Sequence, residues 1–141
     1  MFDKKYEDRL RAWVDLRSRL ETSHTPLQDA IDFYNRAPLV TISVDPYDEE
    51  SWLDPWTLIY ENTYCEFACL LGIAYSLQLT TRFSQCQFEI HICTNKEMSE
   101  VKYLLYVDND VIGYLRDRAV DAESIPENLK IEKKYCLPPL Q

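Results

Sequence analysis

The chain has 141 residues, of which 46% are hydrophobic and 28% charged, and its formal net charge is −9. This length and composition predict a single folded domain over residues 1–141 and exclude a disordered chain. The acidic charge disfavours nucleic acid as a partner, because phosphate backbones are repelled. The chain has only two glycines, so it contains neither the phosphate-binding P-loop motif nor the G-x-G-x-x-G dinucleotide-binding motif.

The first third of the chain is predicted to contain two helices. Over residues 3–22, apolar residues recur at spacings of three and four, which places them on one face of a helix. Thr25 and Pro26 then form a helix-start signal, with threonine as the cap and proline at the first position. Pro38 ends this second helix by residue 37, because the position before a proline avoids the α region.

The next segment, residues 39–44, alternates in polarity and is predicted to be a strand. Val40, Ile42 and Val44 would share one side of it. Residues 45–53 follow as an acidic loop.

The middle of the chain, residues 54–79, is its most apolar segment. Asp54 and Pro55 open it as cap and first helical position. A second start signal lies inside it, because the sequence from Thr63 to Glu66 fits the S/T-x-x-E capping box. The segment therefore predicts either one helix over 55–79 or a short helix followed by a second one from Thr63. In both cases apolar residues on every side indicate a helix at the centre of the fold.

After Arg82 the periodicity changes from helical to alternating, which is typical of strands. A tight turn at Asp108–Asp110 separates two of the four expected strands, which cover residues 88–93, 101–107, 111–115 and 130–136. The order of elements predicts an α+β fold, with N-terminal helices and a buried central helix packed on an antiparallel β-meander.

The five cysteines are odd in number, irregular in spacing and partly within apolar runs. Such residues are typical of free thiols in a reducing compartment. The N-terminus has no apolar signal-peptide region, and the longest nearly uncharged run, residues 67–81, is too short and too polar to cross a bilayer. We therefore expect an intracellular protein without a membrane partner.

Cys65 is the candidate nucleophile, because a helix start near it would lower the pKa of its thiol. His91 would act as the base and Asp108 would orient the imidazole. This order of residues, over about residues 63–108, resembles that of the papain and transglutaminase-like superfamily. The resemblance implies a cysteine hydrolase or transferase.

Several features depart from that superfamily. Glu66 beside Cys65 would oppose thiolate formation, and the usual aromatic or small residues around the cysteine and the tryptophan near the histidine are missing. Cys65 is equally explained as a small buried residue, His91 as a strand residue with a polar neighbour, and Asp108 as a turn residue. The triad is therefore the alternative to a non-enzymatic function.

A zinc-stabilised module is a weaker alternative. Cys65 and Cys69 lie one helical turn apart, and His91 and Cys93 lie on one face of a strand, so four ligands are present. Structural zinc usually uses cysteine pairs on loops, whereas Cys69 lies deep in the apolar helix. We therefore predict no cofactor and no metal.

The chain is rich in aromatic residues, with ten tyrosines and three tryptophans. Aromatic side chains are enriched at interaction hot spots, although a thick aromatic core is an equal alternative. They predict contact with another protein or self-association, and the candidate interface residues are Tyr47, Trp52, Trp56, Tyr60, Tyr103, Tyr106 and Tyr114.

Over most of residues 5–140, the chain resembles a family of small, functionally unassigned proteins of large contractile-tailed phages of marine bacteria and cyanobacteria. The resemblance rests on the segments LQDAIDFYNRAPLVTISVDPYD, DPWTLIYENTYCEFACLLGIAYSLQLTTRF, FEIHI and YLLYVDNDVIGY. It implies a phage origin and a product made in the host bacterial cytoplasm, where it stays or joins the virion. It implies no activity, so we predict a non-enzymatic interaction protein, either a virion component or a small effector.

Overall fold

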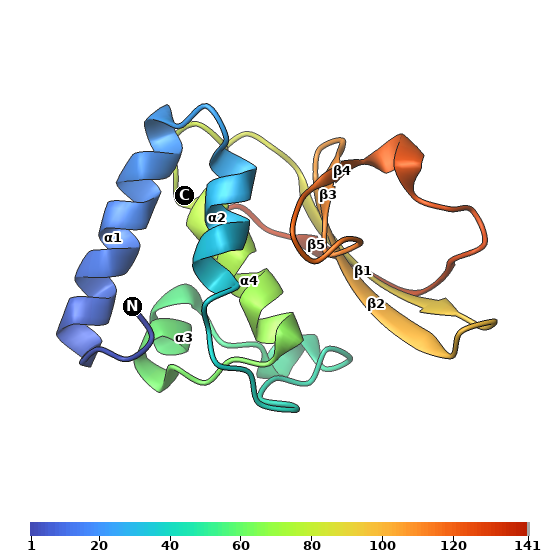
Figure 1. Cartoon of the computed structure of the whole chain (residues 1–141), viewed down its shortest axis with the longest axis horizontal. Helices are drawn as coiled ribbons and strands as arrows, with labels where there is room; N and C mark the ends of the chain where they lie inside the picture. The colour runs from blue at the N-terminus through green and yellow to red at the C-terminus, as the bar shows by residue number, and fades with distance from the viewer. Residues whose placement is uncertain (141) are drawn as a thin grey trace.

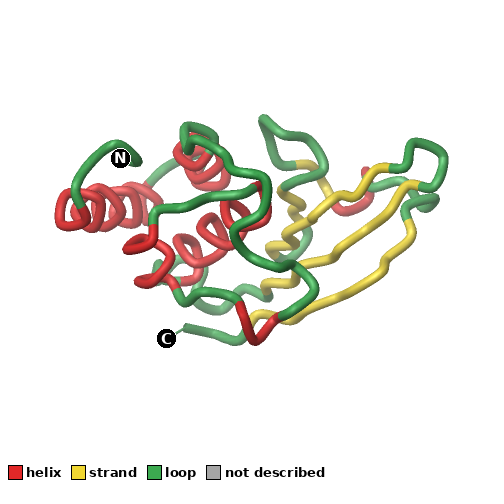
Figure 2. The backbone as a smooth tube through the Cα atoms, turned by 90° about the horizontal axis from the view of Figure 1, so that it is seen from below, coloured by secondary structure: helices red, strands yellow, loops and turns green. Residues whose placement is uncertain are grey.

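The computed structural model describes residues 1–140 and divides them into a helical part and a sheet. The α-helices gather at one end of the molecule, and the sheet extends from them towards the other (Figures 1 and 2). The helices are α1 (Tyr6–Thr22), α2 (Pro26–Tyr34), α3 (Pro55–Glu61) and α4 (Glu66–Gln78), and two short 3₁₀ turns cover Glu49–Ser51 and Ala122–Ser124.

The strands form one antiparallel sheet in the order β4-β3-β2-β1-β5. Their bounds are β1 (Phe88–Asn95), β2 (Glu100–Val107), β3 (Asp110–Ile112), β4 (Val120–Asp121) and β5 (Lys130–Leu137). The predicted α+β fold is confirmed. The expected meander holds only for the first four strands, because β5 returns to the far side of β1. This pairing places β1, the most buried strand, between two long neighbours.

Helix α4 lies at the centre, as its sequence predicts, and all of its residues except Glu66 and Cys69 are buried. Of the two predicted arrangements, the structure has two helices. Asn62 adopts a left-handed conformation (φ 53°) that ends α3. The predicted cap at Thr63 is wrong, because the Thr63 hydroxyl donates to the Glu61 carbonyl. Cys65 caps α4 instead, and its Sγ accepts a hydrogen bond from the N–H of Ala68 at 3.4 Å.

The predicted strand at residues 39–44 is wrong. Only one isolated bridge joins Leu39 to Tyr64, and the Val40 N–H donates to the Tyr64 carbonyl at 2.9 Å. Thr41 and Ile42 make no backbone hydrogen bond to another backbone group of the described chain, so no ladder continues from the bridge. Val44 is buried, but Val40 and Ile42 on the same predicted side are exposed.

Two apolar clusters pack on opposite faces of the sheet. The larger one joins the helices to the face that carries Phe88, Ile90 and Leu105. The smaller one contains Cys93 and Leu104 and is covered by the chain between β3 and β5. Within residues 1–140, no helix combines the length and apolar character needed to traverse a bilayer.

Candidate functional site

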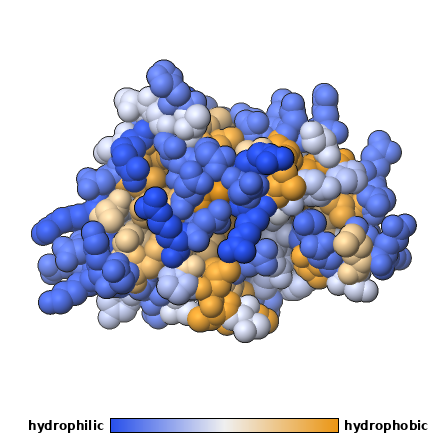
Figure 3. All heavy atoms as spheres, viewed as in Figure 1, coloured by the Kyte–Doolittle hydropathy of each residue, from blue (hydrophilic) through white to orange (hydrophobic). Residues whose placement is uncertain are grey.

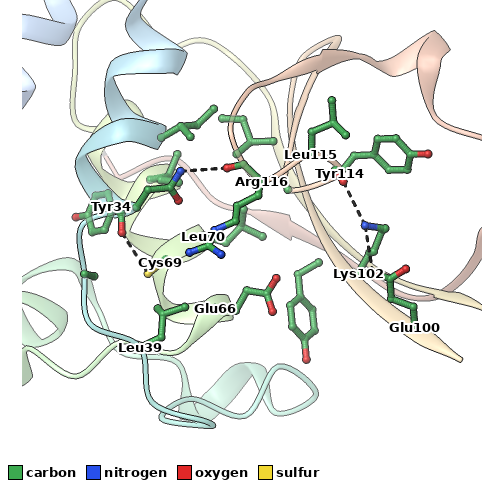
Figure 4. Close-up of a pocket in the computed structure, with 17 residues that line it drawn as sticks. Tyr34, Leu39, Glu66, Cys69, Leu70, Glu100, Lys102, Tyr114, Leu115 and Arg116 are labelled. Atoms are coloured by element: carbon green, nitrogen blue, oxygen red, sulfur yellow. Dashed lines mark hydrogen bonds and ion pairs between the residues drawn. The ribbon is translucent and has the colours of Figure 1, made fainter. Parts of the chain in front are cut away.

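A pocket of about 370 Å³ lies where the helical part meets the sheet. Its walls come from α2 and the turn after it, the first half of α4, the start of β2, and the loop that follows β3 (Figure 4). Buried apolar side chains from α2, α4 and β3 line its inner part: Ile31, Leu70, Ile73 and Ile112. The pocket therefore has an apolar floor.

The loop after β3 forms one wall, and its course depends on Gly113. This residue has φ 108°, and a Cβ at this position would collide with the carbonyl oxygen of Tyr103. Only glycine adopts this conformation without strain. The end of the loop is held by α2 and its following turn, because the side-chain amide of Asn35 donates to the Arg116 carbonyl at 3.1 Å and that of Gln28 to the Asp117 carbonyl at 2.7 Å.

Four charged side chains surround the pocket. Lys102 Nζ lies 3.5 Å from a carboxylate oxygen of Glu100 and donates to the Tyr114 carbonyl at 3.2 Å. Arg116 and Glu66 form no ion pair with each other or with any other residue of the described chain. Figure 4 shows the guanidinium of Arg116 reaching into the pocket towards Glu66 and Cys69. Both residues are exposed, so one cation and one anion at the pocket are solvated rather than paired within the described chain.

The Cys69 thiol also lines the pocket and donates to the Tyr34 carbonyl at 3.8 Å. Burial, followed by the nearby Cys65 and Glu66, raises its pKa to about 12, against the opposing effect of Arg116. The thiol is therefore in its neutral, less reactive form at physiological pH.

Cys65, the candidate nucleophile, is only 3% exposed. Its N–H donates to the Ser43 hydroxyl at 3.2 Å. Burial acts to raise the pKa of its thiol, but hydrogen bonds from Ser43, Ala68 and Val44 outweigh burial, so the pKa is lowered. The thiol is ionised more easily than usual, but it is shielded from solvent.

His91, the candidate base, faces the other side of the sheet. Side chains alternate along β1, so Ile90 and Ile92 face the helices while His91 faces away from them. The His91 ring stacks on Tyr106 with 4.2 Å between centroids, and its Nε2 lies 3.0 Å from an oxygen of Glu89. The sheet therefore separates His91 from Cys65.

Asp108, the candidate orienting residue, forms hydrogen bonds with the backbone of Gln87 rather than with a histidine. Its Oδ1 accepts a hydrogen bond from the Gln87 N–H at 2.9 Å, and its own N–H donates to the Gln87 carbonyl at 3.0 Å. Its φ of 50° is one that aspartate tolerates in turns. The structure brings none of Cys65, His91 and Asp108 together.

The four residues considered as zinc ligands are also divided by the sheet. Cys65 and Cys69 belong to the helical side, whereas His91 and Cys93 point to the opposite face. Across residues 1–140, no group of three or more histidine, cysteine, aspartate or glutamate side chains is placed to hold a metal ion.

The candidate interface aromatics divide into two groups. Tyr47, Trp56 and Tyr60 are half exposed or more. The other four are only partly exposed and make contacts within the molecule: Trp52 with Phe67 and Tyr135, Tyr103 with Phe67, Tyr106 with His91, and Tyr114 with Lys102. Two of the exposed group also contact aromatic rings of α1, Trp56 with Trp13 and Tyr60 with Tyr6. Much of the aromatic surplus thus belongs to internal packing.

The sequence did not identify Arg116 at the pocket or the exposed apolar residues of 39–42 as candidate functional residues. Arg116 lies in a charged stretch that has the composition of an ordinary surface loop, so no pattern marks it. Leu39, Val40 and Ile42 carried a signal, because their alternation predicted a strand, but nothing local showed that their side chains would stay exposed.

No family model, curated protein or solved structure matches this chain. The function is therefore inferred from the contacts and surfaces of the chain itself.

Proposed function

We propose that this chain is a non-enzymatic interaction protein that binds an extended segment of another protein along residues 39–44, here called the docking segment. The observation that carries the proposal is the exposure of its apolar side chains: 52% for Leu39, 46% for Val40 and 73% for Ile42. Figure 3 shows apolar surface at the lower edge of the molecule, where this segment lies in Figure 1. Exposed apolar patches of this kind mark interaction sites.

The backbone of the docking segment supports binding by strand addition. The segment is held in place, because Val40 bonds to the Tyr64 carbonyl and the Ser43 hydroxyl donates to the Thr63 carbonyl at 3.3 Å. Thr41 and Ile42 make no backbone hydrogen bond to another backbone group of the described chain. A strand-like sequence without a neighbouring strand can accept one from a partner, whose main chain supplies the missing hydrogen bonds.

Charge indicates the chemistry of the partner. The docking segment leads directly into an acidic loop that contains Asp45, Asp48, Glu49 and Glu50, and the whole chain carries −9. Complementary charge guides association and suppresses wrong partners. The partner segment we propose is therefore extended, apolar at alternate positions and flanked by lysine or arginine.

Two further points support this proposal over the cysteine hydrolase. Cys65 is shielded from solvent, and the sheet separates it from His91. The phage origin, and a location in the host cytoplasm or the virion, are proposed from the sequence resemblance alone.

The test uses the double variant Val40→Thr/Ile42→Thr, which keeps β-branched residues but removes apolar surface. The matched control is Val14→Thr/Met98→Thr, at exposed apolar positions in α1 and the β1–β2 turn. Each immobilised protein is exposed to lysate of phage-infected bacteria, and the captured protein is identified, purified and titrated against all three forms.

The expected result is a partner that binds wild type and control with equal Kd and the double variant at least about tenfold more weakly, as expected when hot-spot residues are lost. Equal binding to all three forms would place the interface elsewhere. A wild-type chain that is monomeric by light scattering and captures no protein would contradict the proposal altogether.

A further inference from the structure

The pocket between the helices and the sheet has the size and character of a small-molecule site. Its volume of about 370 Å³ falls within the range of about 300–1,000 Å³ usual for such sites. The floor is apolar, built from Leu70 and Ile73 of α4, Ile31 of α2 and Ile112 of β3. Such a floor suits a branched aliphatic or aromatic group.

The charged residues at the rim of the pocket determine which polar groups a ligand needs in order to bind there. Lys102 is already neutralised by Glu100 at 3.5 Å, so this pair has little to offer a ligand. Arg116 and Glu66 remain, of opposite charge and without an ion pair anywhere in residues 1–140. Both line the pocket, and the guanidinium of Arg116 points into it (Figure 4).

A ligand with a single charge would fit this rim poorly. A simple anion would be attracted by Arg116 but repelled by Glu66, and a simple cation would meet the reverse. A molecule with a carboxylate and an ammonium group in close proximity can pair with both side chains. A carboxylate also matches the forked donors of a guanidinium, which favours the orientation with the carboxylate at Arg116.

We infer that this pocket binds a small zwitterion with a large apolar side chain, an α-amino acid of the leucine or phenylalanine type. The carboxylate pairs with Arg116, the ammonium group pairs with Glu66, and the side chain lies on the apolar floor. The hydrogen bonds from Asn35 and Gln28 hold the backbone of the loop that carries Arg116, which keeps the base of this side chain at the pocket. This inference rests on the pocket alone, and its failure would leave the docking segment proposal untouched.

The experiment titrates the uniformly ¹⁵N-labelled full chain with three ligands while amide resonances are followed by NMR. L-leucine carries both charges, L-leucinamide lacks the carboxylate, and N-acetyl-L-leucine lacks the ammonium group. Gly113 is a convenient reporter, because it lines the pocket and is one of only two glycines. The titrations are run slightly below neutral pH, so that the amine of leucinamide stays protonated.

Wild type is expected to bind L-leucine most tightly, with each capped analogue about twofold to fivefold weaker, the range typical of loss of one exposed ion pair. No saturable shift of pocket amides with L-leucine, or equal Kd values for the three ligands, would overturn the inference.

Two variants test which charged group of the ligand pairs with Arg116 and which pairs with Glu66. Arg116→Gln should bind L-leucinamide at least as tightly as L-leucine, because the carboxylate no longer has a counterion and is repelled by Glu66. Glu66→Gln should bind N-acetyl-L-leucine at least as tightly as L-leucine, because the ammonium group no longer has a counterion and is repelled by Arg116. The matched control is Arg118→Gln, which removes an exposed arginine that pairs with Asp117 at 3.8 Å outside the pocket. It should keep the wild-type order, and an effect equal to that of Arg116→Gln would overturn the inference.

Discussion

The indole N–H of Trp13 donates a hydrogen bond of 2.8 Å to the hydroxyl of Ser76 in the middle of the helical core. Ser76 in turn donates to the Gly72 carbonyl one turn earlier in α4, at 2.7 Å. Both side chains are fully enclosed. This contact connects α1 to the central helix by a directional bond, and the Tyr34 hydroxyl of α2 lies 3.4 Å from the same Ser76 oxygen.

We predict that Ser76→Ala destabilises the protein by about 1–3 kcal/mol, because the buried indole N–H of Trp13 loses its acceptor. The free energy of unfolding in urea measures the change. Ser18→Ala, at an exposed serine of α1, is the control and should change stability by less than about 0.5 kcal/mol. Equal stability of the two variants would mean that another group replaces Ser76.

The parts of the fold that were predicted correctly depend on local patterns. The apolar stripe of α1 and the apolar surface of α4 specify helices whatever packs on them, and the alternation in residues 88–93 specifies a strand. The pairing of β5 with β1 was missed because strand order depends on contacts between distant residues. The cap at Cys65 was missed because a thiol is not among the common capping groups.

The site was less predictable than the fold. Cys65 and His91 each had a sound local argument, but the alternation of side chains along β1 placed them on opposite faces of the sheet. The proximity of Arg116 and Glu66 depends on the loop after β3, whose course is set by Gly113 and by hydrogen bonds from α2 and its following turn. The first relationship follows from residue spacing only once the helices are known to pack on the Ile90 face, and the second depends on contacts between distant residues.

Gly113→Ala should destabilise the chain by about 1–3 kcal/mol, because alanine at φ 108° is strained and its Cβ would collide with the Tyr103 carbonyl. Thermal or urea unfolding measures the loss. Asp117→Ala in the same loop is the control, because its side chain makes only an exposed ion pair with Arg118, worth little. If both variants unfold at the same urea concentration, the loop tolerates a side chain at Gly113 and its course must depend on other contacts.

Stability should also depend on the ionisation of Glu21 at the end of α1. Its two carboxylate oxygens accept hydrogen bonds from the N–H groups of Thr81 at 2.8 Å and Arg82 at 2.9 Å. These bonds hold the pKa of Glu21 below its ordinary value of 4.5. The carboxylate therefore stabilises the folded state fully above that value, and the contribution is lost as the pH falls through the lower folded-state pKa.

We accordingly expect Glu21→Gln to be less stable than wild type at pH 7, with a difference that shrinks as the pH falls below about 4. Urea unfolding at a series of pH values measures it. Glu127→Gln, at an exposed loop residue, is the control and should follow the wild-type profile. A difference that stays constant with pH would show that the Glu21 carboxylate does not act through its charge.

The last prediction concerns the reactivity of the cysteines. Cys136 on β5 is exposed, whereas Cys65 is only 3% exposed, although the pKa of its thiol is lowered. Burial raises the pKa of Cys69 to about 12 and that of Cys86 to about 11, which makes both slow to react. Access, rather than ionisation, should therefore decide which thiol reacts first.

With a thiol-selective disulfide reagent at neutral pH, one fast phase is expected in the folded protein, and Cys136→Ser should remove it. Cys65 should react only at the rate at which the chain opens, because the reagent cannot reach a thiol enclosed by Ser43 and the first turn of α4. A fast phase that persists in Cys136→Ser and is removed by Cys65→Ser would show an accessible, activated thiol. That outcome would favour the cysteine hydrolase alternative, with a base other than His91, over a purely interacting protein.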